Sequence, residues 1–267
     1  MSQELLVEVK NRVAVLTMNR PDTLNAITGT MSETAANTLE ELSSNPDVGA
    51  VVLTGAGRGF CAGGDVSNMQ KRVGDVDGAG ISLERRVDAL RRGHRFPWLL
   101  HTMPKVTIAA INGPCAGAGL GIAMCCDLRI ASEKAKFTTA YANVGFGGDY
   151  GTTWQLTQLV GMAKAKELFF LTDAFASDVA ERYGLVNRVV SHEKLLAETM
   201  QIAERIAAGP LVSYRYMKAN VNMSTVCDFR TMLDREAETH LRCGETQDHK
   251  EGVNAFMEKR KPAYVGR

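Results

Sequence analysis

The sequence has 267 residues, of which 45% are hydrophobic, with 31 Lys and Arg against 30 Asp and Glu. This length suits one large domain, or one domain with an appendage, and the hydrophobic fraction excludes wholesale disorder. The formal net charge of +1 argues against nucleic acid as a partner. No apolar run reaches the length of about 18 residues that a membrane-spanning helix needs.

Strands and helices are predicted to alternate in the first three quarters of the chain. The predicted strands are Leu5–Val9, Val13–Met18, Gly49–Thr54, Val106–Ile111, Leu128–Ala131, Lys136–Thr138 and Leu185–Val190. The predicted helices are Thr28–Leu42, Ser82–His101, Gly119–Cys126, 152–160 and 162–171. Residues 71–82 follow no period and contain three glycines, so we expect a mobile loop there. Helices alone are expected after Pro210, which predicts an α/β core over residues 1–205 and a helical subdomain over 206–267.

The N-terminal end and the cysteines indicate a cellular compartment. The first ten residues carry Glu4 and Glu8 and lack an apolar signal core, so secretion is not expected. The six cysteines contain no CxxC pair or other metal-binding spacing. We therefore expect a cytoplasmic protein with reduced thiols and no metal site.

Glycine is unevenly distributed. Thirteen of the 25 glycines lie in the three segments 55–64, 113–121 and 145–151. The first two segments each follow a predicted buried strand, and the second leads into a helix, so both expose backbone N–H groups. One such turn alone is usually structural, but two sets of donors that converge form an oxyanion hole, which stabilises an enolate or a tetrahedral oxyanion.

Three segments carry a resemblance to a known family. GRGFCAGGD (57–65), PKVTIAAINGPCAGAGLGIAMCCDLRIAS (104–132) and AKFTTAYANVGF (135–146) resemble the crotonase (enoyl-CoA hydratase/isomerase) superfamily. The resemblance extends from RPDTLNA at 20–26 to EGVNAFMEKRKPAY at 251–264. It implies an α/β spiral of ββα units with a helical C-terminal subdomain that forms trimers, which are often paired as hexamers. It also implies an acyl-CoA thioester substrate, with coenzyme A as part of the substrate and no other cofactor.

The resemblance also assigns residues. The oxyanion-hole N–H groups correspond to Gly64 and Ala118. The positions that correspond to the coenzyme A site are Thr23, Leu24, Ala26 and Ala62, together with Phe256 and Lys259, which in this family sometimes reach across a subunit boundary.

Two catalytic glutamates of the hydratases are absent. Their positions correspond to Gly121 and Tyr141, and neither residue can take up a proton from water near neutral pH. Asp149 is the carboxylate that remains in this region. Some isomerases of the superfamily place an acid/base carboxylate there, and the chlorobenzoyl-CoA dehalogenases place their nucleophile there. The alternative is that Asp149 caps a helix that begins near Thr152.

Other candidate residues have structural alternatives. His94 matches a histidine of the dehalogenase pattern and can act as a base, although a histidine in an RRGHR run is commonly a solvated surface residue. Tyr141 is a third catalytic candidate, as a hydrogen-bond donor, and Tyr141 and Trp98 are also candidates to line an acyl pocket or to pack in the core. Cys61 is expected to be a small buried residue and Asp65 the N-cap of a helix at 66–70.

The leading hypothesis is therefore an acyl-CoA enzyme of fatty, branched or cyclic acid catabolism. Gly64 and Ala118 would bind the thioester oxygen, and Asp149 would be the general acid/base in isomerisation, or in hydration with a non-standard water site. One alternative is displacement with Asp149 as the nucleophile. The dehalogenase pattern has a tryptophan at the position of Tyr141, and this difference argues against displacement. The other is a catalytically degenerate oligomer that binds acyl-CoA.

Overall fold

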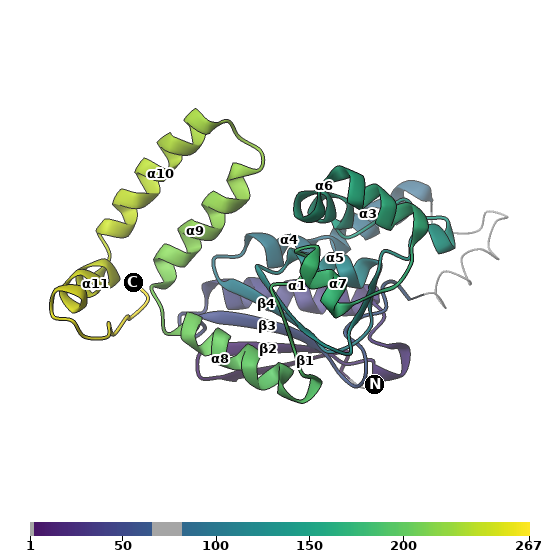
Figure 1. Cartoon of the computed structure of the whole chain (residues 1–267), viewed down its shortest axis with the longest axis horizontal. Coiled ribbons are helices and arrows are strands. Elements are labelled where there is room, and N and C mark those ends of the chain that lie inside the picture. The colour runs from purple at the N-terminus through teal and green to yellow at the C-terminus, as the bar shows by residue number, and fades with distance from the viewer. Residues whose placement is uncertain (1–2, 66–81) are drawn as a thin grey trace.

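A central six-stranded sheet organises the molecule (Figure 1). The computed structural model describes residues 3–65 and 82–267. The sheet has the order β1-β2-β3-β4-β6-β9, and all neighbouring strands are parallel except β1 and β2. Its strands are β1 (Leu5–Lys10), β2 (Val13–Met18), β3 (Ala50–Gly55), β4 (Val106–Ile111), β6 (Leu128–Ser132) and β9 (Arg188–Val190). A smaller sheet contains β5 (Cys115–Ala116), β7 (Lys136–Thr138) and β8 (Phe175–Ala176).

Helices cover both faces of the large sheet. The α-helices among the described residues before Pro210 are α1 (Gly29–Ser44), α3 (Leu83–Gly93), α4 (Arg95–Thr102), α5 (Ala118–Cys125), α6 (Thr152–Leu171), α7 (Ser177–Arg182) and α8 (Leu195–Ala207). Along β3, Val51 and Leu53 face the core that includes α1, α4 and α5, whereas Ala50 and Val52 face α8. Burial on both faces explains the continuous apolar run of this strand, which is typical of parallel sheets. The expected α/β architecture is thus confirmed.

Most predicted elements are present. The strands at Val13–Met18, Val106–Ile111 and Lys136–Thr138 have the predicted bounds. The two helices predicted at 152–160 and 162–171 are confirmed as the two halves of α6, which meet at Gly161, where the backbone is not helical, with φ at 74° and ψ at 162°.

The long helix predicted over Ser82–His101 is wrong. It is divided into α3 and α4 at His94, and Ser82 is the N-cap of α3. Pro97 explains the division, because a residue without an N–H cannot donate to the carbonyl of Gly93 as a continuous helix requires. The break places His94 at the junction of two helices.

One strand is shorter than predicted, and two predicted segments lie outside the described residues. The strand predicted over Leu185–Val190 begins only at Arg188, because the N–H groups of Leu185 and Val186 donate to the carbonyl of Ala180 after α7. The mobile loop predicted at 71–82, apart from Ser82, and the short helix predicted at 66–70 lie outside the described residues.

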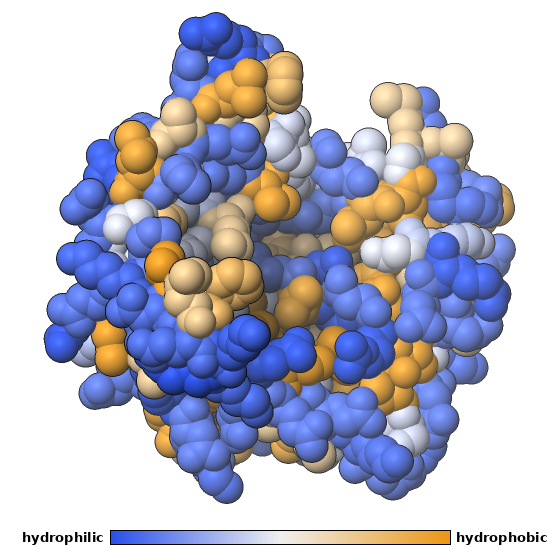
Figure 2. Space-filling model, turned by 60° about the vertical axis from the view of Figure 1, so that its left-hand side comes forward, coloured by the Kyte–Doolittle hydropathy of each residue, from blue (hydrophilic) through white to orange (hydrophobic). Residues whose placement is uncertain are grey.

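The C-terminal part is helical, as predicted. It consists of α9 (Leu211–Ser224), α10 (Phe229–Gly244) and α11 (Gln247–Met257), and α9 and α10 stand away from the core as a helical arm (Figure 1). Helix α8 ends at Ala207 and packs on the sheet, so the arm begins after it; the division at 205/206 stays a prediction. The arm exposes large hydrophobic side chains, and Figure 2 shows orange patches around a hollow on this side of the molecule. The large hydrophobic side chains exposed on α9, α10 and α11 and in the loop between α9 and α10 include Met217, Val221, Val226, Phe229, Leu233, Leu241, Val253, Phe256 and Met257.

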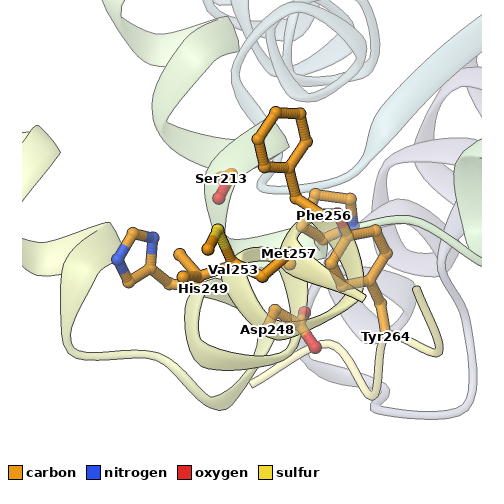
Figure 3. A pocket seen from close by; sticks show the side chains of 9 residues that line it. Ser213, Asp248, His249, Val253, Phe256, Met257 and Tyr264 are labelled. Carbon is orange, nitrogen blue, oxygen red and sulfur yellow. The ribbon is translucent and has the colours of Figure 1, made fainter. Parts of the chain in front are cut away.

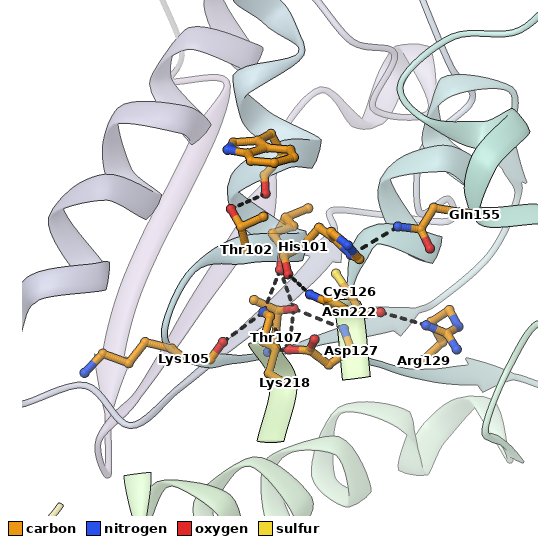
Figure 4. Close-up of polar contacts among 12 residues, drawn as sticks. His101, Thr102, Lys105, Thr107, Cys126, Asp127, Arg129, Gln155, Lys218 and Asn222 are labelled. Atoms are coloured by element: carbon orange, nitrogen blue, oxygen red, sulfur yellow. Dashed lines mark hydrogen bonds and ion pairs between the residues drawn. The ribbon is translucent and has the colours of Figure 1, made fainter. Parts of the chain in front are cut away.

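Lys218 fixes the arm to the core (Figure 4). Its side chain is 6% exposed, and Nζ lies 2.8 Å from Oδ2 of Asp127. Nζ also donates to the carbonyls of Leu100 and Lys105, at 2.9 and 3.1 Å. One buried ammonium thus joins α9 to α4 and to the residues that directly precede β4 and β6.

We expect Lys218→Met to destabilise the protein by about 3 kcal/mol, because it leaves the Asp127 carboxylate partly buried without its cation. Thermal unfolding of the variant measures this. Lys164→Met removes an exposed ion pair with Glu167 and should change the unfolding midpoint little. Equal midpoints for wild type and Lys218→Met would show that this contact does not fix the arm.

Candidate active site

The first two glycine-rich loops are joined backbone to backbone. The N–H of Cys61 donates to the carbonyl of Pro114, and the N–H of Ala116 donates to the carbonyl of Cys61. A Cβ atom on Gly119 would lie 2.3 Å from the carbonyl oxygen of Cys61, so glycine is required for this approach. The loops are therefore held together at the carboxyl ends of β3 and β4.

This contact brings Gly64 and Ala118 to the same place. Gly64 pairs with Ile27 as a parallel bridge made through the carbonyl of Gly63 and the N–H of Asp65, so the N–H of Gly64 itself points away from Ile27. Ala118 is the first residue of α5, where an N–H has no acceptor within the helix. A Cβ atom on Gly63 would lie 3.5 Å from the nitrogen of Ala118. Within residues 3–65 and 82–267, neither N–H is donated to a protein acceptor.

The segment predicted to meet coenzyme A lies beside the first loop. It contains Thr23, Leu24 and Ala26, and the N–H of Ala62 donates to the carbonyl of Leu24 at 2.9 Å. Sequence reasoning missed Asn25, which is fully buried with φ at 58°. Its amide donates to the carbonyls of Ala56, Gly59 and Phe60, which fixes the shape of the loop. The signal for it was an asparagine, a residue that tolerates positive φ, next to a turn.

Asp149 and His94 lie in contact, although 55 positions separate them in the sequence. Nε2 of His94 is 2.6 Å from Oδ1 of Asp149, and the N–H of Tyr150 donates to the same oxygen at 2.8 Å. An ionised carboxylate only accepts, so the Nε2 atom carries the proton. In the part of the chain that the structure describes, Oδ2 of Asp149 has no hydrogen-bond partner. The side chain is 27% exposed and that of His94 is 40% exposed.

The capping role considered for Asp149 is not seen. The N-cap of α6 is Gly151, with no side-chain hydrogen bond, and the backbone carbonyl of Asp149 accepts from the N–H of Thr152. His94 is likewise not a freely solvated surface residue, because its ring is paired.

The two positions of the missing glutamates are filled. A Cβ atom on Gly121 would lie 2.4 Å from Oγ1 of Thr152 and 2.9 Å from the carbonyl oxygen of Tyr150. Tyr141 is buried, and its hydroxyl donates to the carbonyl of Asp149 at 3.0 Å and contacts Oγ1 of Thr152 at 2.8 Å. Burial raises the pKa of Tyr141 well above its usual value, so its phenol stays neutral. Position 121 thus has no room for a side chain, and the Tyr141 hydroxyl is already paired with the turn that carries Asp149 and with the start of α6.

Other candidates lie elsewhere or are inert. The side chain of Trp98 is 65% exposed, so it is not a core residue. Cys61 is fully buried, and burial raises its pKa to about 12, which excludes a thiolate nucleophile at neutral pH. Asp65 forms an ion pair with Arg20 at 2.8 Å; its predicted capping role concerns residues outside those described. Across 3–65 and 82–267, no group of three or more His, Cys, Asp or Glu could hold a metal ion.

Phe256 is at the end of α11 and Lys259 follows it, and α11 lies beside the start of α9. Phe256 is 82% exposed at the end of α11, beside a cavity of about 350 Å³ (Figure 3). Lys259 follows α11 in a left-handed conformation, with φ at 55°. Tyr264 lines this cavity, and the residues that follow it are held nearby because the N–H groups of Val265 and Gly266 donate to Asp248. Within this chain, no described contact joins Phe256 or Lys259 to Gly64, Ala118 or Asp149.

Comparisons with known proteins show the family of the chain. Residues 8–267 match the family model described as enoyl-CoA hydratase/isomerase. The chain is 37% identical to a short-chain-enoyl-CoA hydratase of Clostridium acetobutylicum, covering 96% of this chain and 95% of that protein. It is 34% identical to the 1,2-epoxyphenylacetyl-CoA isomerase of Escherichia coli over the whole of both chains. Among solved structures, an enoyl-CoA hydratase of Bacillus anthracis superimposes with a TM-score of 0.91 at 30% identity, covering 99% and 100% of the two chains.

The matched region includes both glycine loops, the Asp149 turn and the helical arm. The sequence resemblance is thus confirmed along nearly the full length. The chain is an enzyme that belongs to the enoyl-CoA hydratase/isomerase family of the crotonase superfamily.

Proposed function

We propose that this enzyme moves a proton between two carbons of an acyl-CoA thioester, with Asp149 as general acid/base. Asp149 removes a proton from the acyl chain, the electron pair moves into the thioester carbonyl, and the resulting enolate oxygen accepts hydrogen bonds from the N–H groups of Gly64 and Ala118. The same carboxyl group returns the proton at a different carbon. This sequence isomerises a double bond, conserves every atom, and needs no cofactor beyond the coenzyme A of the substrate.

The geometry of the Asp149 carboxylate is the observation that carries this proposal. Two donors, the ring of His94 and the N–H of Tyr150, hold Oδ1 in place. Oδ2 remains for the substrate, and one positioned oxygen suits a single acid/base that both takes and returns a proton.

The proposed oxyanion hole is supported by the two backbone donors. The N–H groups of Gly64 and Ala118 belong to loops that are fixed to each other, and neither has a protein acceptor in the described part of the chain. Donors that are already oriented stabilise developing charge without rearrangement. Tyr141 connects this region to Asp149, because its ring lies against Gly117 and its hydroxyl contacts the carbonyl of Asp149.

Isomerisation is favoured over hydration by the filled glutamate positions. Hydration across a conjugated double bond needs a water molecule oriented by paired carboxylates. Gly121 has no room for a side chain, and Tyr141 is neutral and already hydrogen-bonded. The Escherichia coli relative is named an isomerase, which agrees with this choice, whereas the Clostridium acetobutylicum relative is named a hydratase.

Binding of coenzyme A is proposed along the Thr23–Ala26 segment and Ala62. Their backbones lie side by side at the mouth of the first loop. Phe256 and Lys259 are proposed to complete this site from a neighbouring subunit, since α11 lies beside the start of α9 and no described contact joins either residue to the glycine loops of this chain.

Assembly as a homotrimer or homohexamer is part of the proposal. Exposed apolar side chains along α9, α10 and α11 support it, because a monomer rarely leaves so many uncovered. No helix in the described ranges is long and apolar enough to cross a membrane. The cytoplasmic location and the absence of a nucleic-acid partner stay predictions.

A second candidate function is displacement at the acyl group with Asp149 as the nucleophile. The contact between His94 and Asp149 favours it, since an imidazole beside the carboxylate could activate the water that hydrolyses an ester intermediate. The replacement of the dehalogenase tryptophan by Tyr141 argues against it.

The test is incubation with straight, branched and aromatic enoyl-CoA thioesters, followed by mass measurement of products and protein. We expect a product of unchanged mass and altered retention time, together with deuterium exchange from solvent at the α or γ carbon. A product heavier by one water would indicate hydration. An acyl adduct on the peptide that contains Asp149 would indicate displacement, and binding without exchange or turnover would contradict catalysis altogether.

A further inference from the structure

We propose that Tyr150, anchored by Ser32, is a positioning residue that holds the ring of His94 against the Asp149 carboxylate. This inference rests on the proposed function, in which Asp149 is the acid/base.

Tyr150 contacts both members of the pair. Its N–H donates to Oδ1 of Asp149, the oxygen that also contacts Nε2 of His94. Its ring meets the ring of His94 edge to face, with centroids 5.4 Å apart and planes at 77°. One residue therefore limits the position of the carboxylate through its backbone and the orientation of the imidazole through its side chain.

The ring of Tyr150 is itself held from the core. Its hydroxyl lies 2.8 Å from Oγ of Ser32, and Tyr150 and Ser32 are 7% and 1% exposed. Ser32 belongs to the first turns of α1, whose neighbouring residues Met31 and Ala35 are fully buried. The hydroxyl contact thus connects the candidate site to one of the long core helices.

This anchor matters because the Tyr150 backbone is in an unfavourable conformation. Its φ is 52°, in the left-handed region that a bulky residue rarely adopts. Such a conformation persists only where the surroundings determine it. The hydroxyl contact with Ser32 and the packing against His94 supply those surroundings.

Glycine at position 93 permits the arrangement. A Cβ atom there would lie 3.2 Å from the hydroxyl oxygen of Tyr150 and 3.9 Å from Cβ of Ser32. The end of α3 can therefore approach α1 closely, and His94 follows directly. Tyr150 is not the acid/base itself, because burial raises its pKa to about 12 and its phenol stays protonated at neutral pH.

The kinetic test uses Tyr150→Phe, Ser32→Ala and the double variant. Tyr150→Phe keeps the ring and loses only the hydroxyl. Because one hydrogen bond is removed, we expect each single variant to lower kcat by about 3- to 10-fold with KM unchanged. The double variant should be no slower than either single one, since all three lack the same bond. Ser43→Ala is the matched control on α1, far along the helix, and should keep the wild-type kcat.

A spectroscopic test isolates positioning from general damage. In enzyme labelled with nitrogen-15 histidine, the ring N–H of His94 should give a slowly exchanging proton signal, assigned by its loss in His94→Gln. We expect this proton to exchange faster in Tyr150→Phe and in Ser32→Ala than in the wild type. In Ser43→Ala it should exchange at the wild-type rate. Wild-type kcat and exchange in both variants would overturn the inference.

The two proposals can fail separately. The His94 signal is measured without substrate, so it tests positioning whether or not Asp149 is the acid/base. Full turnover by Asp149→Asn would contradict the proposed function. Loss of turnover in Asp149→Asn, with unaltered Tyr150→Phe and Ser32→Ala, would contradict the positioning role alone.

Discussion

Replacing Asp149 by Asn is expected to lower kcat by about 10²- to 10⁴-fold, the usual contribution of a general acid/base. The amide has nearly the shape of the carboxylate but cannot take up the substrate proton. Its oxygen can still accept from the N–H of Tyr150 and from Nε2 of His94, so the turn should keep its conformation. The measurement is turnover of whichever enoyl-CoA thioester the wild-type enzyme isomerises.

Binding separates loss of chemistry from loss of the site. The dissociation constant for a non-reactive acyl-CoA should stay within a few-fold of the wild-type value, since Asp149 is not part of the proposed coenzyme A site. Asp178→Asn is the matched control, because Asp178 lies on the surface of α7 and pairs with Arg182. A wild-type rate in Asp149→Asn would remove this residue from the mechanism.

The second large effect is expected from Gly121→Glu, which restores the glutamate of the hydratases. We expect no gain of hydration and a loss of about 3 kcal/mol in the free energy of unfolding. The first side-chain atom would lie 2.4 Å from Oγ1 of Thr152 and 2.9 Å from the backbone oxygen of Tyr150, and a carboxylate would then be buried beyond them. The turn that carries Asp149 would have to move.

Thermal unfolding and a hydration assay on crotonyl-CoA check this expectation. Gly29→Glu is the matched control, because nothing lies within 4 Å of a Cβ atom at Gly29 and an acidic residue suits the first turn of α1. A stable Gly121→Glu enzyme that hydrates its substrate would mean that the Asp149 turn can yield to a second water-binding carboxylate.

Secondary-structure elements could be predicted from the sequence where a single local pattern defines them. Strand β4 was predicted with its observed bounds because a strand buried on both faces is a continuous apolar run. The break at His94 was missed because the helical period continues through the RRGHR segment, while the effect of Pro97 is exerted four residues earlier. Local pattern thus finds elements more readily than the joints between them.

Only part of the candidate site could be predicted from the sequence. Glycine spacing led to the two loops, because close backbone approach can be met only by glycine and small residues, and the family resemblance assigned Gly64 and Ala118 within them. The contact between His94 and Asp149 could not be predicted from local pattern, since it depends on how α3 and the Asp149 turn meet in space. Ser32 gave no signal either, because a serine within an amphipathic helix is compatible with many surroundings.

The hydrogen bonds between Cys61, Pro114 and Ala116 have a consequence for how this protein can change over time. The groups proposed to bind the oxyanion belong to the main chain, and a main-chain N–H is present in every residue except proline. Side chains around the substrate can therefore be exchanged one by one without loss of the anion-binding centre. New substrates, or a new order of proton transfers, are open to such a chain by point substitution, with the common activated intermediate kept throughout.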